Sequence, residues 1–380
     1  MLDAFDFFLV VFCLTAIGHD FHRSDADISL SIWLTLAFRP VGAFLFGMIA
    51  DRYGRRLPLM IDLVFYSIVE ILTGLAPNYA TFMVLRALFG IGMGGEWGVG
   101  ASLAMEEAPA RWRGVLSGLL QQGYASGYLL ASVCFFFLFE HWGWRPLFFL
   151  GGLPALLAIF VRTRVKESEV WRDSKKNTWR ELWSDVNSHW KLFAYITLLM
   201  ALMNFASHGT QDMYPTFLQR QWRYGPAQRA VVTGISMLGA LIGGILIGHL
   251  SDRFGRKRAI VASLAAAVAM IPLWAWAPGA TWLIVGAFLM QFCVQGAWGV
   301  IPAHLAELAP AGIRGFLPGF AYQCGALISG SVVVFEALAA QRTSYANAMA
   351  FTAAAVFIPG CIVAALGCEY RGRDLRGEHK

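Results

Sequence analysis

A run of polar side chains past the middle of the chain is the richest candidate for a binding site. Within an otherwise apolar stretch, polar residues recur at intervals of three and four, namely Asn204, Ser207, His208, Gln211 and Asp212. On an α-helix this spacing places them along one face. His208 and Asp212, four residues apart, can share or relay a proton. Such a stripe is typical of a helix that borders a polar cavity, and packing hydrogen bonds between helices are the alternative explanation.

A second candidate is Arg39, a basic residue within another apolar stretch. A guanidinium group is permanently charged and can hold a carboxylate through two parallel hydrogen bonds. The residue therefore predicts a site for an organic anion. A structural ion pair with an acidic residue is the alternative.

Three acidic residues in apolar stretches are candidates for proton binding. Asp3 and Asp6 lie near the start of the chain, and Glu96 lies in a later stretch. A carboxyl group away from water favours its neutral, protonated form, so it can take up and release a proton when its surroundings change. Ion pairing with Arg39 or Arg86 is the alternative role for these acids.

The composition shows which elements must position these residues. Of the 380 residues, 57% are hydrophobic and 14% are charged, against roughly 45–50% and 25% in an average soluble protein. Apolar stretches of about 20 residues recur, each long enough to cross ~30 Å of hydrocarbon as a helix. We place them at roughly 1–18, 28–50, 57–76, 80–105, 115–139, 145–162, 191–218, 228–250, 258–277, 281–305, 316–340 and 346–368. The predicted fold class is an all-α membrane protein with twelve transmembrane helices.

The basic residues alternate between loops. Of the 30 Lys and Arg residues, 22 lie in every second loop and in the tail. The positive-inside rule places these loops in the cytoplasm, together with the polar segments 163–190 and 369–380. This pattern predicts a multi-pass protein of a bacterial-type inner membrane with a cytoplasmic C-terminus. Because the charges are not gathered on one soluble face, we expect no nucleic-acid partner.

The chain contains an internal repeat. The run from Gly47 to Arg56 returns from Gly248 to Lys257, so that Asp252 follows Asp51 by 201 residues. The same offset relates other matching residues, and it places Asn204 and Ser207 at the positions of Asp3 and Asp6. Such a duplication predicts two pseudo-symmetric bundles of six helices, with a substrate site near the midplane between them. We expect the bundles to be residues 1–162 and 191–368, joined by a cytoplasmic linker at 163–190 and followed by a tail at 369–380.

The repeated runs suit tight turns between helices. Glycine permits the chain reversal, and the cations can pair with the aspartate or with helix ends. We expect these signature loops to act as a gate whose ion pairs break when the bundles rock, and a simple topological anchor is the alternative. The gating candidates are Gly47, Asp51, Arg52, Gly54, Arg55, Asp252, Arg253, Gly255 and Arg256.

The repeat also bears on the first helix. The seventh span begins near Lys191, and the offset would place the start of the first span about ten residues before Met1, since equivalent helices of the two repeats should have similar lengths. We therefore expect the first helix to be truncated at its start.

The signature loops resemble those of the major facilitator superfamily, and the likeness covers nearly the whole chain. The run from Asn204 to Thr216 also matches the pattern Asn-x-x-[Ser/Thr]-His-x-[Ser/Thr]-Gln-Asp-x-x-x-Thr of lactate and pyruvate permeases in the sialate:proton symporter family. This resemblance implies proton-coupled uptake of short monocarboxylates, with Asn204, His208, Gln211 and Asp212 as site residues. Arg39, followed here by Pro40, resembles a functional arginine of that group.

The resemblance adds one further position. Gln323, in the run Tyr322-Gln323-Cys-Gly325, resembles a specificity residue. The predicted function is therefore proton-coupled symport of a lactate-type or pyruvate-type acid by alternating access, with a small carboxylate, protons and the lipid bilayer as partners. Substrate binding is assigned to Arg39, Asn204, Ser207, His208, Gln211 and Gln323, and proton coupling to Asp3, Asp6, Glu96, His208 and Asp212.

Two other functions remain open at this point. Sialic acid is the second candidate substrate, because the same family carries it. A non-transporting membrane sensor is the alternative from another class, although the chain lacks a long cytoplasmic segment for a signalling domain. We expect no enzyme, no cofactor and no metal site, because no nucleophile and base or cluster of metal ligands is apparent in the sequence.

Overall fold

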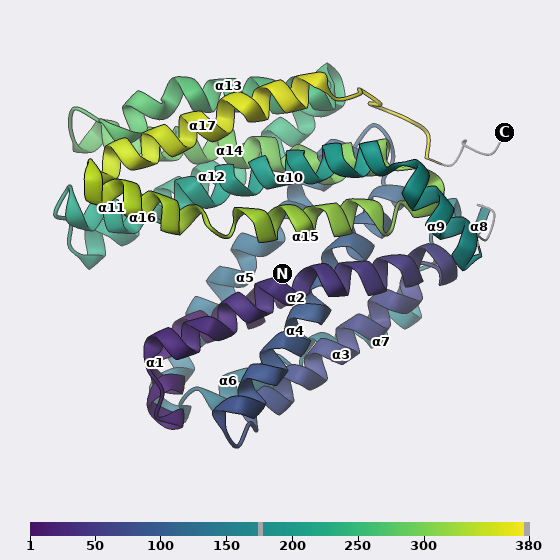
Figure 1. Cartoon of the computed structure of the whole chain (residues 1–380), viewed down its shortest axis with the longest axis horizontal. Coiled ribbons are helices and arrows are strands. Elements are labelled where there is room, and N and C mark those ends of the chain that lie inside the picture. Colours follow the sequence, from purple (N-terminus) through teal and green to yellow (C-terminus); the bar gives the residue numbers. More distant parts are fainter. Residues whose placement is uncertain (174–177, 376–380) are drawn as a thin grey trace.

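The apolar periodicity of the sequence folds into a bundle of long helices. The computed structural model describes residues 1–173 and 178–375, and its regular elements in these ranges are all helical (Figure 1). Ten helical segments of this part are long and apolar enough to cross a membrane. Two further spans complete the predicted set of twelve. One of them carries the charged residues Arg86 and Glu96, and the other is broken at Gly330. The expected twelve-helix, all-α architecture is confirmed.

The first half of the chain contains five continuous spans and one broken span. Their bounds are α1 Leu2–Phe21, α2 Asp25–Tyr53, α3 Arg56–Gly74, α4 Tyr79–Glu107, α5 Arg113–Trp142, α6 Arg145–Leu150 and α7 Pro154–Arg164. The sixth span divides into α6 and α7 because Gly151 and Gly152 precede Pro154, which cannot continue the backbone hydrogen bonding of a helix. Two short helices, α8 Glu169–Asp173 and α9 Trp179–Ser188, follow.

The second half repeats this arrangement with two broken spans. The elements are α10 Trp190–Gln211, α11 Tyr214–Arg220, α12 Pro226–Phe254, α13 Arg256–Ala275, α14 Ala280–Leu308, the short 3₁₀ helix η1 Ala311–Ile313, α15 Leu317–Ser329, α16 Val332–Arg342 and α17 Tyr345–Leu366. The seventh span breaks at Met213, where Pro215 begins the next turn. The eleventh breaks at Gly330 and Ser331.

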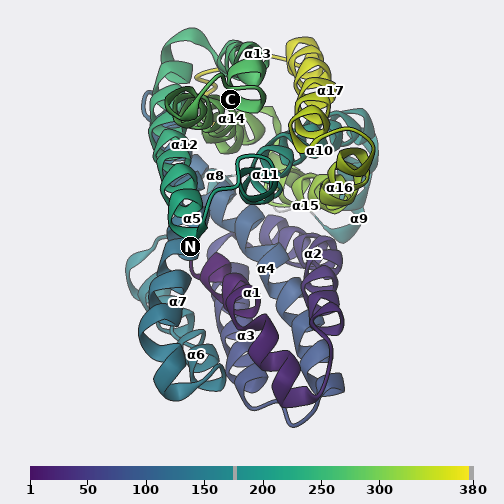
Figure 2. The same ribbon diagram turned by 90° about the vertical axis from the view of Figure 1, so that its left-hand side faces the viewer.

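The helices gather into two bundles, one from α1–α7 and one from α10–α17 (Figure 2). Each bundle encloses a hydrophobic core of its own, built around residues such as Phe89 and Phe148 in the first and Trp274 and Phe357 in the second. Figure 1 shows the bundles lying closer together at the end that carries α8 and α9 than at the end that carries α6 and α11. We call the closer end the signature-loop end, because it carries the turns at 51–56 and 252–257.

Close packing of α2 on α4 fixes the position of Arg39. A side chain at Gly94 on α4 would clash with the carbonyl oxygen of Arg39 on α2. Small residues at such crossings let two helix backbones approach closely. The glycines of the fourth span therefore hold the α2 backbone in place beside the region between the bundles.

Candidate functional site

Arg39 faces the opposite bundle. Its guanidinium carbon lies 5.8 Å from the centre of the Tyr322 ring on α15, a cation–π distance. Arg39 forms no ion pair with the residues that the structure describes, and its Nε atom has no hydrogen-bond partner there. The side chain is half-buried. The charge of Arg39 is thus presented between the bundles without an ion-pairing carboxylate from the described part of the chain.

Tyr322 belongs to an aromatic contact between the bundles. Its ring stacks on Trp97 of α4, with centroids 4.4 Å apart, and meets Trp298 of α14 edge-on at 5.8 Å. The Trp97 indole donates a hydrogen bond to Gln121 Oε1 at 3.2 Å. Trp97 and Trp298 pack on the Tyr322 ring, which contacts Arg39 from the second bundle. Sequence reasoning missed them because an aromatic residue in a span is read as part of the apolar surface.

His208 and Asp212 lie near the end of α10. The Nδ1 atom of His208 is 3.1 Å from Asp212 Oδ2, and the two side chains remain 41% and 38% exposed. The pair predicted from their spacing is therefore present. Its exposure leaves the second ring nitrogen of His208 and the outer carboxylate oxygen of Asp212 available to a ligand or a proton.

The other members of the predicted stripe bond to neighbouring backbone or helices. Gln295 donates a hydrogen bond to Ser207 Oγ at 2.9 Å, and Gln211 donates to Gln291 Oε1 at 2.8 Å. Gln291 and Gln295 are both on α14. Asn204 is buried and donates to the carbonyl oxygen of Met200 in its own helix at 2.8 Å. The structure thus divides the stripe into an open pair, His208 and Asp212, and a bonded group that fixes the orientation of α10.

Tyr124 of α5 lies near residues from four other helices. Its hydroxyl group lies within electrostatic range of Arg39, Tyr322, Asp212 and Asp3. Charges interact appreciably only over short distances. Arg39 and Asp212, which are 173 positions apart in the sequence, therefore border the same region.

The three acids proposed for proton coupling have different surroundings. Asp3 accepts a hydrogen bond from the amino group of Met1 at 3.0 Å. Asp6 is fully buried, and neither of its carboxylate oxygens has a hydrogen-bond partner in the described part of the chain. Glu96 is half-buried, and its Oε2 atom is likewise without one.

Arg86 has a partner that sequence reasoning did not consider. Its Nη2 atom lies 2.8 Å from Glu70 Oε2 on α3, and both side chains are buried. Asp62, about two helical turns before Glu70 on α3, is also buried. An acidic residue within a predicted span indicates a paired or protonated carboxyl group, because an unpaired, ionised carboxylate in a membrane costs free energy. Glu70, Asp62 and Glu336 of α16 are all residues of this kind.

Gln323 lies on a different face of α15 from Tyr322. Its side chain is 1% exposed, and neither its Oε1 nor its Nε2 atom has a hydrogen-bond partner among the described residues. The adjacent Tyr322, not Gln323, contacts Arg39. A buried amide with no partner retains its full capacity to bond a water molecule or a ligand.

The first signature loop joins the two bundles. Asp51 of α2 accepts hydrogen bonds from the backbone amides of Gly315 and Phe316, at 2.7 and 2.9 Å, at the start of the eleventh span. Arg55 bonds both Asp51 and Glu106, and its Nη2 atom lies 3.0 Å from Glu106 Oε1. Burial disfavours the charge of Arg55, yet the carboxylates of Glu106 and Asp51 raise its pKa above the ordinary value. Arg314 adds a second cation 4.0 Å from Glu106 Oε1, so the loop is a buried network of two cations and two carboxylates.

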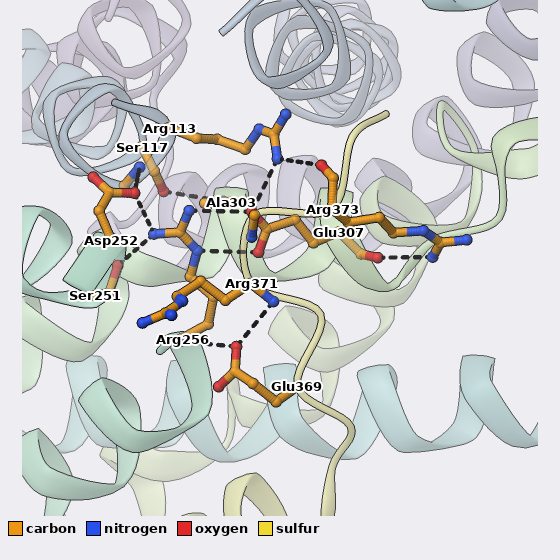
Figure 3. A network of polar contacts seen from close by, with 12 residues as sticks. Arg113, Ser117, Ser251, Asp252, Arg256, Ala303, Glu307, Glu369, Arg371 and Arg373 are labelled. Atoms are coloured by element: carbon orange, nitrogen blue, oxygen red, sulfur yellow. Dashed lines mark hydrogen bonds and ion pairs between the residues drawn. The ribbon is translucent and has the colours of Figure 1, made fainter. Parts of the chain in front are cut away.

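The second signature loop makes the corresponding contacts in reverse. Asp252 accepts hydrogen bonds from the backbone amides of Gly114 and Val115, at 2.8 and 3.3 Å, where α5 begins. Arg256 lies between Asp252 and Glu307, and its Nε atom is 3.0 Å from Glu307 Oε2 (Figure 3). Each bundle thus caps the first turn of a helix in the other, which satisfies backbone amides that have no partner within their own helix.

A direct ion pair strengthens the second network. Arg113 of α5 lies 3.0 Å from Glu307 of α14 and also donates to the carbonyl oxygen of Arg373 (Figure 3). Glu369, which precedes that tail segment, accepts hydrogen bonds from the backbone amides of Arg256 and Lys257. The other gating candidates lie around these contacts. Gly54 and Gly255, with φ angles of 103° and 107°, allow the tight turns, and Gly47 packs on Phe316.

In the described ranges, no group of three or more His, Cys, Asp or Glu side chains could hold a metal ion. What the described residues of the site do contain is a guanidinium without an ion pair and an open His–Asp pair, between two bundles that are locked together at one end.

Twelve membrane-spanning helices in two such bundles, with matching interhelical loops, define a membrane transport protein. The chain belongs to the Major Facilitator Superfamily, which it matches over residues 1–332 and again over residues 212–373. The second match overlaps the first, as expected for a duplicated sequence. Members of this superfamily are transporters rather than enzymes, and so is this chain.

Known proteins resemble the chain along nearly its whole length. It is 30% identical to the "carboxylic acid transporter protein homolog" of Saccharomyces cerevisiae, over 98% of this chain and 67% of that protein. It is 28% identical to the sialic acid transporter NanX of Escherichia coli, over 86% of this chain and 81% of that protein. The structure of the proton:xylose symporter XylE superposes with a TM-score of 0.81 and 18% identity, covering 99% of this chain and 95% of that one, and shows the shared fold.

Proposed function

We propose that this protein is a secondary active transporter that takes up a short monocarboxylate of the lactate or pyruvate type together with a proton. The observation that carries this proposal is Arg39, a guanidinium that faces the opposite bundle with no ion pair among the described residues. A permanent charge in such a position is costly and marks a substrate pathway. A carboxylate would offset the charge and accept two parallel hydrogen bonds from it.

The substrate would bind between Arg39 and the open end of α10. The carboxylate pairs with Arg39, while the His208 imidazole donates to the hydroxyl or keto oxygen of the acid and the Asp212 carboxylate accepts from a hydroxyl group. Ser207 and Gln211 act by holding α10 against α14 through their hydrogen bonds to Gln295 and Gln291. Asn204 and Gln323, both buried, complete the polar surroundings and bond the acid or its accompanying water when the bundles rearrange.

Proton coupling would use the titratable groups around this region. Asp3, Asp6 and Glu96 lie on the first and fourth spans, and the His208–Asp212 pair lies on the seventh. Uptake of one proton with one monocarboxylate moves no net charge, so the electrical cost of carrying an anion is removed. Protonation on the outer side would favour binding, and release of the proton inside would weaken retention of the acid.

Access to the site would alternate between the two sides of the membrane. The contacts of Asp51 and Asp252 hold the bundles together at the signature-loop end, which we assign to the cytoplasm of a cell with the chain in its inner membrane and its C-terminus inside. Rocking of residues 1–162 against residues 191–368 would break these contacts and open that end, with 163–190 as the cytoplasmic linker between the moving parts.

The names of the relatives favour an acidic substrate without fixing its size. The yeast relative is named for carboxylic acids and the Escherichia coli relative for sialic acid. Sialic acid is therefore the second candidate. Lactate and sialic acid share a carboxylate, so both would engage Arg39, and only the space around the carboxylate would distinguish them.

The test is uptake of radiolabelled lactate by proteoliposomes. We expect an inward proton gradient to accelerate uptake, and a protonophore to abolish the acceleration. Replacing Arg39 with Ala removes a charge-assisted pair worth about 1.5–3 kcal/mol, so the apparent affinity should fall about 10- to 150-fold. Arg342→Ala, at an exposed position on α16, is the matched control and should leave affinity unchanged.

Three other outcomes would contradict parts of the proposal. Uptake unaffected by the protonophore would exclude proton coupling. Strong competition of lactate uptake by unlabelled sialic acid, with acetate and pyruvate ineffective, would favour the larger substrate. Binding of an acid without uptake of any acid tested would favour the sensor.

A further inference from the structure

Glu336 is a buried acidic residue of the eleventh span that the proposed site does not use. It lies on α16, and its side chain is 1% exposed. Neither carboxylate oxygen makes a hydrogen bond with any residue that the structure describes. A buried acid with a purely structural role is normally hydrogen-bonded or ion-paired. Glu336 therefore needs another explanation.

The carboxyl group of Glu336 lies against the helix that carries the open His–Asp pair. A Cβ atom at Gly209 of α10 would be 3.3 Å from Glu336 Oε1 and 3.5 Å from a methyl group of Thr352 on α17. Gly209 follows His208 and precedes Asp212 by three residues, so Glu336 packs beside the turn that joins them. The absence of a side chain at Gly209 makes room for this approach.

Among the residues that the structure describes, no charged group pairs with Glu336. On α10 the nearby titratable groups are His208 and Asp212, and the Asp212 carboxylate lies within electrostatic range of Glu336. On its own helix, Arg342 is six residues away and projects from a different face. Helix α17 carries no Asp, Glu, Lys, Arg or His. The neighbouring charge is therefore of the same sign as that of an ionised Glu336.

An ionised carboxylate in this place would be expensive. Its transfer from water costs several kcal/mol even after relaxation of the protein, and the repulsion from Asp212 adds to that cost. The neutral acid avoids both penalties. In this conformation Glu336 is thus expected to hold its proton while Asp212, half-exposed, is in contact with the region between the bundles.

We propose that Glu336 is a proton-binding residue of the C-terminal bundle, which holds a proton in the conformation described here and exchanges it with the His208–Asp212 pair. This inference rests on the proposed proton-coupled uptake and adds a coupling residue to it. The proton leaves the Glu336 carboxyl group and binds the Asp212 carboxylate or the His208 imidazole beside Gly209, so that Glu336 becomes the carboxylate and its acceptor gains one positive charge. No other reactant is required.

Two readouts on the full chain test the proposal with Glu336→Gln. The first is infrared spectroscopy of the reconstituted protein at neutral pH, in which the C=O band of protonated carboxyl groups should decrease in the variant by the component that Glu336 contributes. The second compares lactate uptake driven by a proton gradient with lactate counterflow at equal pH. Because counterflow needs no net proton movement, we expect it to survive, while gradient-driven accumulation falls about 5- to 150-fold, the usual range of a coupling free energy.

Glu140→Gln, at an exposed position near the end of α5, is the matched control. It removes one acidic group and should change neither readout. If Glu336→Gln does not purify as a monodisperse protein, the same two readouts are measured on Glu336→Asp, because its carboxyl group still titrates. Retention of the infrared band and of the gradient effect in that variant supports the proposal, and loss of the gradient effect with the band unchanged overturns it.

The two readouts separate this inference from the proposed function. Wild-type protein without proton-stimulated lactate uptake would contradict the proposed function, while the infrared band would still decide whether Glu336 carries a proton. An unchanged band in Glu336→Gln would overturn the inference, and so would a proportional loss of counterflow and gradient-driven uptake, even where wild-type uptake is fully proton-coupled.

Discussion

The two ends of the interface between the bundles differ in how completely their charges are paired. At the signature-loop end, Asp51, Arg55 and Glu106 are buried and bonded to one another, and Asp252, Arg256 and Glu307 repeat the arrangement. In the middle of the interface, Arg39 lacks an ion pair in the described structure. Arginine side chains are thus ion-paired at the signature-loop end, whereas in the middle of the interface the arginine side chain is available to a ligand.

This difference separates a lock from the proposed binding site. A buried ion pair that is fully bonded gives a defined geometry, and removing one partner exposes the unpaired charge of the other. An unpaired charge bordering an open region has the opposite property, since a ligand of the opposite sign gains the whole interaction. The bonded end would hold one conformation, while under the proposed function Arg39 would supply affinity for the substrate.

The largest predicted effect comes from placing a large side chain where α15 packs on α4, so that the signature-loop end can no longer close. A Cβ atom added to Gly319 of α15 would lie 2.7 Å from the Cα atom of Gly98 on α4, so the two backbones are in contact. Gly319→Ile should prevent this approach at a cost of about 3 kcal/mol, or roughly a 150-fold loss of the closed state. We expect a longer distance between spin labels placed at Arg111 and Arg258, with the six native cysteines replaced by serine.

The control for this experiment lies on the same helix as Gly98. An added Cβ atom at Gly100 meets nothing within 4 Å, so Gly100→Ala should leave the distance distribution unchanged. A Gly319→Ile protein that keeps the wild-type distances would show that the contact between α4 and α15 does not hold the signature-loop end closed.

Much of the fold follows from the sequence because a lipid bilayer imposes strong and simple constraints. Each span needs about 20 apolar residues as a helix, and this rule predicted even the fourth span, which carries both Arg86 and Glu96. The breaks at Met213 and Gly330 were not predicted. A helix interruption inside a span depends on the packing of neighbouring helices around the freed backbone groups, which local composition does not record.

The candidate site was predictable in its charges but not in its partners. The i,i+4 spacing of His208 and Asp212 predicted their contact, because the geometry of one helix fixes it. The stacking of Tyr322 on Trp97 and the pairing of Arg86 with Glu70 join residues that lie far apart in the chain. Such contacts depend on how the helices are arranged. The sequence showed only that acidic residues such as Glu70 lie within predicted spans, and it did not show which residues they pair with.

A smaller effect is expected from removing the carboxylate charge that accepts hydrogen bonds from the opposite bundle at the signature-loop end. Asp51→Asn replaces a carboxylate that accepts two backbone hydrogen bonds, at 2.7 and 2.9 Å, with an amide whose NH₂ group opposes one donor. The cost should be about 1.5 kcal/mol, or roughly tenfold in the population of the closed state. Asp252→Asn should cost less, because its second bond is longer, at 3.3 Å. The same spin-label distances measure both.

Combining the two substitutions tests whether the loops act independently. If they are separate locks, the free-energy changes of Asp51→Asn and Asp252→Asn should add within about 0.5 kcal/mol. A thermal-stability measurement on each variant distinguishes opening of the lock from general unfolding. Equal effects of the two single substitutions would contradict the ranking by bond length.

The smallest effect concerns the open middle of the interface. Tyr322→Leu removes the ring beneath Arg39, and a cation–π contact at a partly exposed site contributes about 0.5–1 kcal/mol, so the affinity for lactate should fall about two- to fivefold. Tyr322→Phe keeps the ring and should leave affinity near the wild-type value. If Tyr322→Phe weakens binding as much as Tyr322→Leu, the hydroxyl group contacts the substrate directly. The aromatic ring would then not be what positions Arg39, and the middle of the interface would hold its ligand by hydrogen bonds from both bundles.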